Sequence, residues 1–97
     1  MGVALVTPFT KDGEVDYATL EKLVQMHIDC GTSFLCVLGT TAETPTLTMA
    51  GKREIRKRVI KQVDGRMPIM VGIGGNCTRA VVEELQNEDL TGVDAIL

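Results

Sequence analysis

The stretch CVLGTTAETPTL, residues 36–47, shows most directly how this chain is built. It overlaps an apolar run, SFLCVLG (33–39), whose length and composition are typical of a buried strand. The run ends at a glycine and passes into two threonines, a glutamate and a proline, residue types that are common in loops and turns. The stretch therefore predicts a buried strand that leads into a polar loop.

Strand-like and helical patterns alternate on both sides of this stretch. The other apolar runs are short and flanked by glycine or proline, whereas the segments between them repeat their apolar residues every three to four positions. The predicted strands are residues 3–9, 33–39, 67–75 and 92–97, and the predicted helices are residues 17–30, 49–63 and 79–87.

Each predicted helix is preceded by a residue that can cap its N-terminus. These residues are Asp16, Thr48 and Thr78, whose side-chain oxygens can accept hydrogen bonds from the free N–H groups of a first helical turn. Gly31 and the Asp-Gly pair at 64–65 provide ends for the first two helices, because glycine enters the left-handed conformation at low cost.

The order β-α-β-α-β-α-β indicates an α/β fold with a parallel sheet. Strands that are apolar throughout are buried on both faces, and helices supply the crossover connections that parallel neighbours need. No linker, repeat or low-complexity tract divides the chain, so residues 1–97 are expected to belong to one domain. Two architectures fit the pattern: a doubly wound open sheet, or the N-terminal portion of a TIM (β/α)8 barrel.

Composition and charge argue against several classes of function. The 97 residues include 10 basic and 13 acidic side chains, a net charge of −3, so no basic excess predicts nucleic-acid binding. No apolar run approaches the roughly 20 residues of a membrane-spanning helix. Cys30, Cys36 and Cys77 form no C-x-x-C motif, and we expect buried free thiols in a reducing cytoplasm rather than a disulfide or a metal site.

The loop after the second strand is the expected location of a site, because ligands bind at the carboxyl ends of the strands in both architectures. Gly39 allows a tight exit from the strand, and Thr40 and Thr41 offer donors for a small carboxylate or a proton transfer. Glu43 could orient the loop by accepting backbone N–H groups. The same residues would equally suit a structural loop that caps its own backbone.

The loop GIGGN (72–76) only partly resembles a phosphate-binding loop. It lacks the G-x-G-x-x-G spacing because position 77 is cysteine, and no G-x-x-x-x-G-K-[ST] motif occurs in the chain. Close backbone packing at a strand end is therefore favoured over phosphate binding. Asn76 is expected to order neighbouring loops through side-chain hydrogen bonds.

The other side chains that could be reactive lie away from these loops in the sequence. His27, the single histidine, lies beside the apolar stripe of the first predicted helix and is expected to be partly buried and structural. The basic run at 51–62 is predicted to form a solvated outer helix face. None of the five lysines lies within a predicted strand or at its carboxyl end, so the sequence offers no buried amine nucleophile.

Three segments resemble a known family. ALVTPF (4–9), LGTTAET (38–44) and VGIGGN (71–76) are similar, in order, to strand ends of the dihydrodipicolinate synthase and N-acetylneuraminate lyase family of class I aldolases, and the likeness covers all 97 residues. The Gly-Thr-Thr-x-Glu element is its most specific part, since the lyases more typically carry Gly-Ser-Thr there. The resemblance implies the (β/α)8 barrel rather than the open sheet.

The resemblance also implies a reaction. The synthases of the family condense pyruvate with aspartate semialdehyde to 4-hydroxy-tetrahydrodipicolinate, in lysine and diaminopimelate biosynthesis. The reaction begins with a Schiff base between pyruvate and a lysine on the sixth strand, and it uses no separate cofactor. Thr41 matches the threonine that binds the pyruvate carboxylate, and Thr40 matches the threonine of the proton relay. The other matching loop residues are Gly39, Ala42 and Glu43.

Further implications concern positions where this chain departs from the family pattern. The family commonly has glycine at the position of Ala42, which would restrict the backbone if that residue needs a positive φ. Asn76 matches one position of the lysine feedback site, although neighbouring positions of that site differ. The Schiff-base lysine, the catalytic tyrosine and the substrate-binding arginine would follow Leu97, so the chain alone is expected to be inactive. The longer protein is expected to be a homotetramer or a homodimer.

Two other functions remain open. Another pyruvate-dependent aldolase of the family, such as a sialic acid or sugar-acid lyase, would use the same loop with a different second substrate. Alternatively, the chain is a non-catalytic, truncated barrel module that associates with itself or with a partner, because its open sheet would expose strand edges and an apolar face.

Overall fold

The computed structural model describes residues 1–97 and contains one parallel sheet with connecting helices. The strands are β1 (Gly2–Ala4), β2 (Phe34–Val37), β3 (Ile69–Val71) and β4 (Ala95–Ile96). The α-helices are α1 (Tyr17–Asp29), α2 (Met49–Val63) and α3 (Thr78–Asn87), and two short 3₁₀ helices, η1 (Thr40–Ala42) and η2 (Thr44–Thr46), follow β2. All predicted strands and helices are present, although the observed strands are shorter than predicted.

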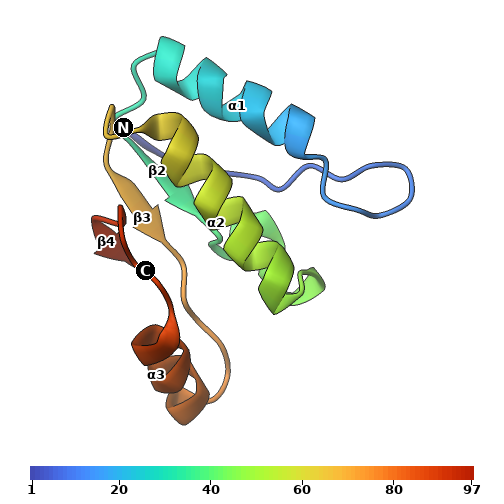
Figure 1. The fold of residues 1–97 in the computed structure, drawn as a ribbon, viewed down its shortest axis with the longest axis vertical. Helices are drawn as coiled ribbons and strands as arrows, with labels where there is room; N and C mark the ends of the chain where they lie inside the picture. Colours follow the sequence, from blue (N-terminus) through green and yellow to red (C-terminus); the bar gives the residue numbers. More distant parts are fainter.

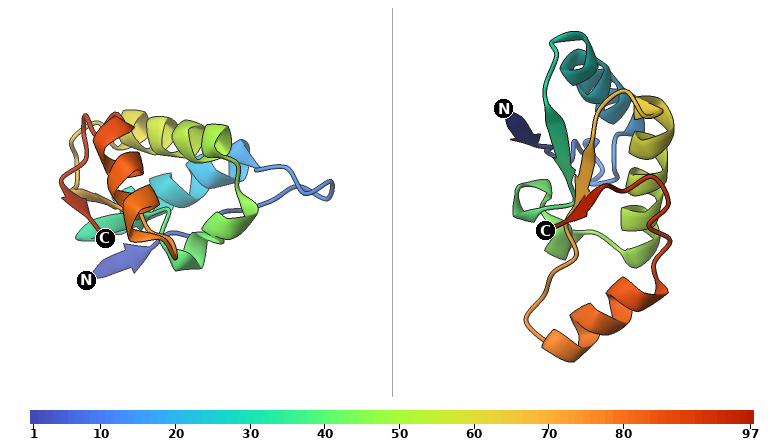
Figure 2. Two further views of the ribbon diagram at one scale, coloured as in Figure 1. Left: turned by 90° about the horizontal axis from the view of Figure 1, so that it is seen from below. Right: turned by 90° about the vertical axis from the view of Figure 1, so that its left-hand side faces the viewer.

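The strand order β1-β2-β3-β4 decides between the two predicted architectures. Each strand pairs in parallel with the next one along the chain, whereas a doubly wound sheet reverses its strand order at a switch point. Helices α1 and α2 pack against each other on one face of the sheet (Figure 1 and Figure 2, right). The chain therefore has the fold of the N-terminal portion of a (β/α)8 barrel.

The hydrophobic core lies between the sheet and these two helices. Val3, Leu35 and Ile69 occupy neighbouring positions across β1, β2 and β3, and their side chains belong to or pack against this core. The fully buried side chains of the core come from both layers: Leu20, Val24, Leu35, Val37, Ile55, Val59, Val63 and Val71. Burial of apolar surface by a two-layer arrangement is thus the main source of stability.

Helix capping follows the sequence prediction at α1 and α2 but not at α3. The Asp16 carboxylate accepts from Thr19 N at 3.1 Å, and this hydrogen bond lowers the pKa of Asp16. Thr48 Oγ1 accepts from Gly51 N at 3.0 Å. The prediction that Thr78 caps α3 is wrong: Thr78 is the first helical residue, and extended Cys77 precedes it without a side-chain hydrogen bond.

The cysteines and the histidine give a mixed outcome. All three cysteines are free, but only Cys36 is buried, so the expectation of three buried thiols is wrong for Cys30 and Cys77. Both exposed cysteines lie at helix ends: Cys30 follows α1 and Cys77 precedes α3. His27 is half-buried on α1, with Nδ1 3.1 Å from Thr32 Oγ1, which confirms its structural position.

None of the helices combines the length and apolar character required to cross a membrane.

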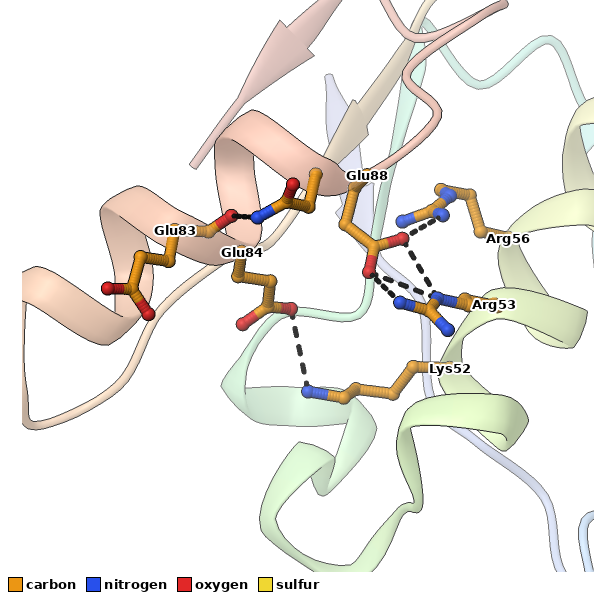
Figure 3. A network of polar contacts seen from close by, with 7 residues as sticks. Lys52, Arg53, Arg56, Glu83, Glu84 and Glu88 are labelled. Carbon is orange, nitrogen blue, oxygen red and sulfur yellow. Dashed lines mark hydrogen bonds and ion pairs between the residues drawn. The ribbon is translucent and has the colours of Figure 1, made fainter.

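The basic run on α2 is only partly a solvated face. Arg53 and Arg56 both donate to the Glu88 carboxylate at the end of α3, and Lys52 lies 3.7 Å from Glu84 (Figure 3). The Arg56–Glu88 pair is short, at 2.6 Å, and the two side chains are only 10% and 3% exposed. The prediction of a wholly solvated face is therefore wrong for Arg56, which helps to connect α2 to α3.

We expect Glu88→Gln to weaken the folded chain in a pH-dependent way. The two arginines lower the pKa of Glu88 from 4.5 to about 2, so its stabilisation is complete above pH 4.5 and is lost as the pH falls towards 2. At pH 7 the variant should lose about 1–3 kcal/mol of unfolding free energy. This range is lower than the pKa shift alone would give, because Arg53 is 56% exposed and solvent screens its ion pair with Glu88.

Urea unfolding between pH 7 and pH 2 measures this difference. Glu83→Gln, on the same helix, is the matched control, because no ion pair involves Glu83. A difference between the Glu88 variant and the unmodified chain that stays constant over the whole pH range would contradict this account of the ion pairs.

Candidate functional site

A cleft of about 300 Å³ lies at the carboxyl ends of the strands. One wall is formed by the loop after β2, including Gly39, Thr40 and Thr44, and the other by the loop after β3, including Gly74 and Gly75. Glycines contribute much of this lining, so backbone groups rather than long side chains border the cleft. The position agrees with the sequence prediction that a site would lie at the loop after the second strand; the loop at 72–76, for which close backbone packing was favoured, forms the other wall.

The loop after β2 presents free backbone donors at the cleft. Gly39 is extended, and the first hydrogen bonds of η1 run from Ala42 N to Gly39 O and from Glu43 N to Thr40 O, both at 3.0 Å. The N–H groups of Thr40 and Thr41 donate to no acceptor within the chain. Unpaired donors at the start of a helical turn favour the binding of an anion.

The two threonines differ in their relation to the cleft. Thr40 and Gly39 line it, whereas exposed Thr41 lies beyond its lining. Both hydroxyls are free of hydrogen bonds within the chain, so neither is used to cap the loop. The structural alternative, in which these threonines satisfy their own backbone, therefore finds no support in their contacts. Thr46 instead takes that role, donating from Oγ1 to Glu43 O at 2.7 Å.

Ala42 and Glu43 shape the loop differently from the sequence prediction. Ala42 lies in η1 and is 2% exposed, so its position does not require a positive φ. The left-handed conformation falls on Glu43, with φ 59° and ψ 41°. The Glu43 side chain is exposed and accepts no hydrogen bond within the chain, so this residue shapes the loop through its backbone rather than its carboxylate.

The loop after β3 contributes open backbone rather than an ordering side chain. A Cβ at Gly74 would meet no atom within 4 Å, so this wall leaves space for a ligand. Asn76 is exposed, lies outside the cleft lining and makes no side-chain hydrogen bond. Its predicted role in ordering the neighbouring loops is therefore not seen in the structure.

Sequence reasoning missed two residues that line the cleft, Leu38 and Leu97, and Leu38 is the more informative. It is buried and has a φ of 60°, a conformation that leucine rarely adopts. The facing residue is Gly72, at which a Cβ would overlap the carbonyl oxygen of Leu38. A glycine within a strand pattern signals a close backbone approach, so Gly72 was detectable from the sequence, whereas the conformation of Leu38 was not.

No lysine lines the cleft. Lys52 lies on α2, with its Nζ 3.7 Å from Glu84, and Lys57 and Lys61 are exposed on the outer side of the same helix. The cleft thus contains hydroxyl and amide donors but no amine that could act as a nucleophile.

These features define a class of protein: a (β/α)8-barrel segment with a cleft at the carboxyl ends of its strands. A sequence profile of the dihydrodipicolinate synthetase family matches residues 1–97. The chain therefore belongs to the dihydrodipicolinate synthetase family.

Individual relatives agree with this assignment. A 4-hydroxy-tetrahydrodipicolinate synthase of Phocaeicola vulgatus is 60% identical over 97 residues, which are 100% of this chain and 33% of that relative. The crystal structure of dihydrodipicolinate synthase from Thermotoga maritima matches 98% of this chain with a TM-score of 0.90 and 35% identity. N-acetylneuraminate lyase from Mycoplasma synoviae matches 96% of this chain with a TM-score of 0.83 and 29% identity. The chain spans about a third of the length of each of these proteins.

Proposed function

We propose that this chain forms the first third of a 4-hydroxy-tetrahydrodipicolinate synthase, which condenses pyruvate with aspartate semialdehyde. The observation that carries the proposal is the 60% identity to the Phocaeicola vulgatus synthase over a match that spans all 97 residues of the chain. The identity to the Mycoplasma synoviae lyase is 29%, which favours a synthase over the lyase alternative.

In this proposal the loop after β2, which borders the cleft, binds the carboxylate of pyruvate. The free N–H groups and hydroxyls of Thr40 and Thr41 are donors, and a carboxylate is an acceptor that strengthens such hydrogen bonds. Thr41 binds the carboxylate and Thr40 transfers protons, while Gly39, Ala42 and Glu43 hold the loop. Thr40 suits a relay because its hydroxyl both donates and accepts, and it lines the cleft.

The covalent chemistry is assigned to a lysine outside residues 1–97. Its amine adds to the pyruvate carbonyl and releases water, giving an imine, and loss of a methyl proton gives the enamine. The enamine carbon attacks the aldehyde carbon of aspartate semialdehyde, whose oxygen takes up a proton. The amino group of the second substrate then displaces the lysine and closes the ring. No step requires an oxidant, a reductant or a separate cofactor.

The enzyme's cellular location and oligomeric state belong to the same proposal. We place it in the cytoplasm as a homotetramer or homodimer, which is supported by its free cysteines and by exposed apolar side chains such as Val82 and Leu85 on α3. Asn76 is the candidate for a lysine-binding position, because its amide is exposed and makes no side-chain hydrogen bond within the chain.

A hybrid enzyme tests the proposal. In the hybrid, this chain replaces the matching third of the Phocaeicola vulgatus synthase, and turnover is measured with pyruvate and aspartate semialdehyde. We expect a rate within about tenfold of the unmodified relative, because a well-formed cleft should preserve transition-state binding to within about 1.4 kcal/mol.

The matched control carries the corresponding segment of the Mycoplasma synoviae lyase in place of this chain. It should turn over aspartate semialdehyde much more slowly than the hybrid. A folded hybrid that fails to consume aspartate semialdehyde, or that performs no better than the control, would contradict the proposal.

A further inference from the structure

The end of β2 contains a buried residue in a strained conformation. Of the three non-glycine residues with a positive φ, Leu38 alone is buried, with an exposed fraction of 4%. Such a conformation persists only where the surroundings impose it. The Leu38 side chain belongs to the hydrophobic core, so its packing holds the residue in place while the chain turns towards Gly39.

The surroundings that impose this conformation include the backbone of Gly72. The Gly72 N–H donates to Val37 O at 2.8 Å. A Cβ at position 72 would overlap the Leu38 carbonyl oxygen and would lie 3.0 Å from the Gly39 Cα. These obstacles are backbone atoms, which cannot rotate away as the end of a side chain can. The contact therefore requires glycine at position 72.

The contact joins the two walls of the cleft directly, through their backbones. The hydrogen bonds of η1 and η2 are all local and connect residues only three positions apart. They fix the shape of the loop but not its place relative to β3. The backbone contact between Leu38 and Gly72 sets that place, immediately before Thr40 and Thr41.

We infer that Leu38 and Gly72 are positioning residues, which hold the Thr40 and Thr41 donors at the spacing that the pyruvate carboxylate requires. This inference rests on the proposed function and adds to it the element that aligns the donors. Neither side chain supplies a hydrogen-bonding group, so both act through the threonines. A small displacement of the loop should weaken pyruvate binding at Thr41 and also slow proton transfer at Thr40.

Two variants of the hybrid enzyme test the inference. Gly72→Ala forces the two backbones apart, and Leu38→Val places a β-branched residue where φ is positive, which such residues strongly disfavour. Each should raise the KM for pyruvate by about tenfold or more and also lower kcat, with the KM for aspartate semialdehyde nearly unchanged. Leu38→Val introduces a smaller side chain and places no new atom between Leu38 and Gly72, so it keeps the test valid if Gly72→Ala does not fold.

Gly65→Ala is the matched control for general destabilisation. Gly65 also has a positive φ, 75°, but a Cβ there meets no atom within 4 Å and the residue lies far from the cleft. The control should lower the urea midpoint and leave the pyruvate KM within about twofold. The inference is overturned if Leu38→Val retains the pyruvate KM of the hybrid, or if Gly65→Ala raises that KM equally. If Thr41→Val also leaves the KM unchanged, the proposed carboxylate site itself fails, which is a separate result.

Discussion

Replacing Thr41 by valine in the hybrid enzyme is expected to lower kcat/KM for pyruvate by about 10- to 150-fold. Valine has nearly the volume of threonine but lacks its hydroxyl donor. A hydrogen bond to a charged group contributes about 1.5–3 kcal/mol. The loss should appear chiefly as a higher KM, because the carboxylate is present in the ground state as well as in the transition state. Initial rates at varied pyruvate concentration measure it.

Thr40→Val provides the contrast within the same loop. A relay threonine takes part in proton transfer in the transition state. Its loss should therefore lower kcat by about 100-fold or more, while the KM for pyruvate changes little. Thr46→Ala serves as the control, since its hydroxyl is committed to Glu43 O and it lies outside the cleft lining. Turnover close to that of the hybrid in both valine variants would contradict the assigned roles.

The second large effect concerns imine trapping by borohydride. The 97-residue chain incubated with pyruvate and sodium borohydride should gain no mass, because none of its lysines lies in the cleft. The hybrid should gain one pyruvate-derived adduct, on a lysine outside residues 1–97. Intact-mass measurement followed by peptide mapping distinguishes the two outcomes.

A control distinguishes non-specific trapping on exposed lysines from trapping in the folded active site. Heat-denatured hybrid treated in the same way should trap no adduct, because an exposed amine is mostly protonated at neutral pH and is a poor nucleophile. An adduct on Lys11, Lys22, Lys52, Lys57 or Lys61 of the isolated chain would show that the nucleophile lies within this chain after all.

The fold was predictable because its signals are local. The apolar run 33–39 and the polar residues after it specify a strand and a loop, and Asp16 and Thr48 mark helix starts by direct hydrogen bonds to the next turn. Local sequence signals do not distinguish the barrel from the doubly wound sheet. The distinction came from the order of strand pairing in the structure, or from the family resemblance, since both architectures share the same β-α alternation.

The cleft was predictable in position but not in detail. Its two loops follow from the rule that ligands bind at the carboxyl ends of parallel strands. The conformation of Leu38 depends on a contact with a residue 34 positions later in the sequence, and the burial of Arg56 depends on Glu88, 32 positions later. Local propensity carries no information about either contact. The roles of Thr40 and Thr41 stay predictions.

The ion pairs between α2 and α3 have a consequence for local unfolding. Helix α3 has no buried residue, and much of its attachment depends on Glu84 and Glu88, whereas α1 and α2 are held by fully buried leucine, valine and isoleucine side chains. Salt screens the exposed Arg53 guanidinium, but it screens the buried Arg56–Glu88 pair much less. We therefore expect higher ionic strength to increase modestly how often α3 opens as a separate cooperative unit, while the first two βα units remain closed.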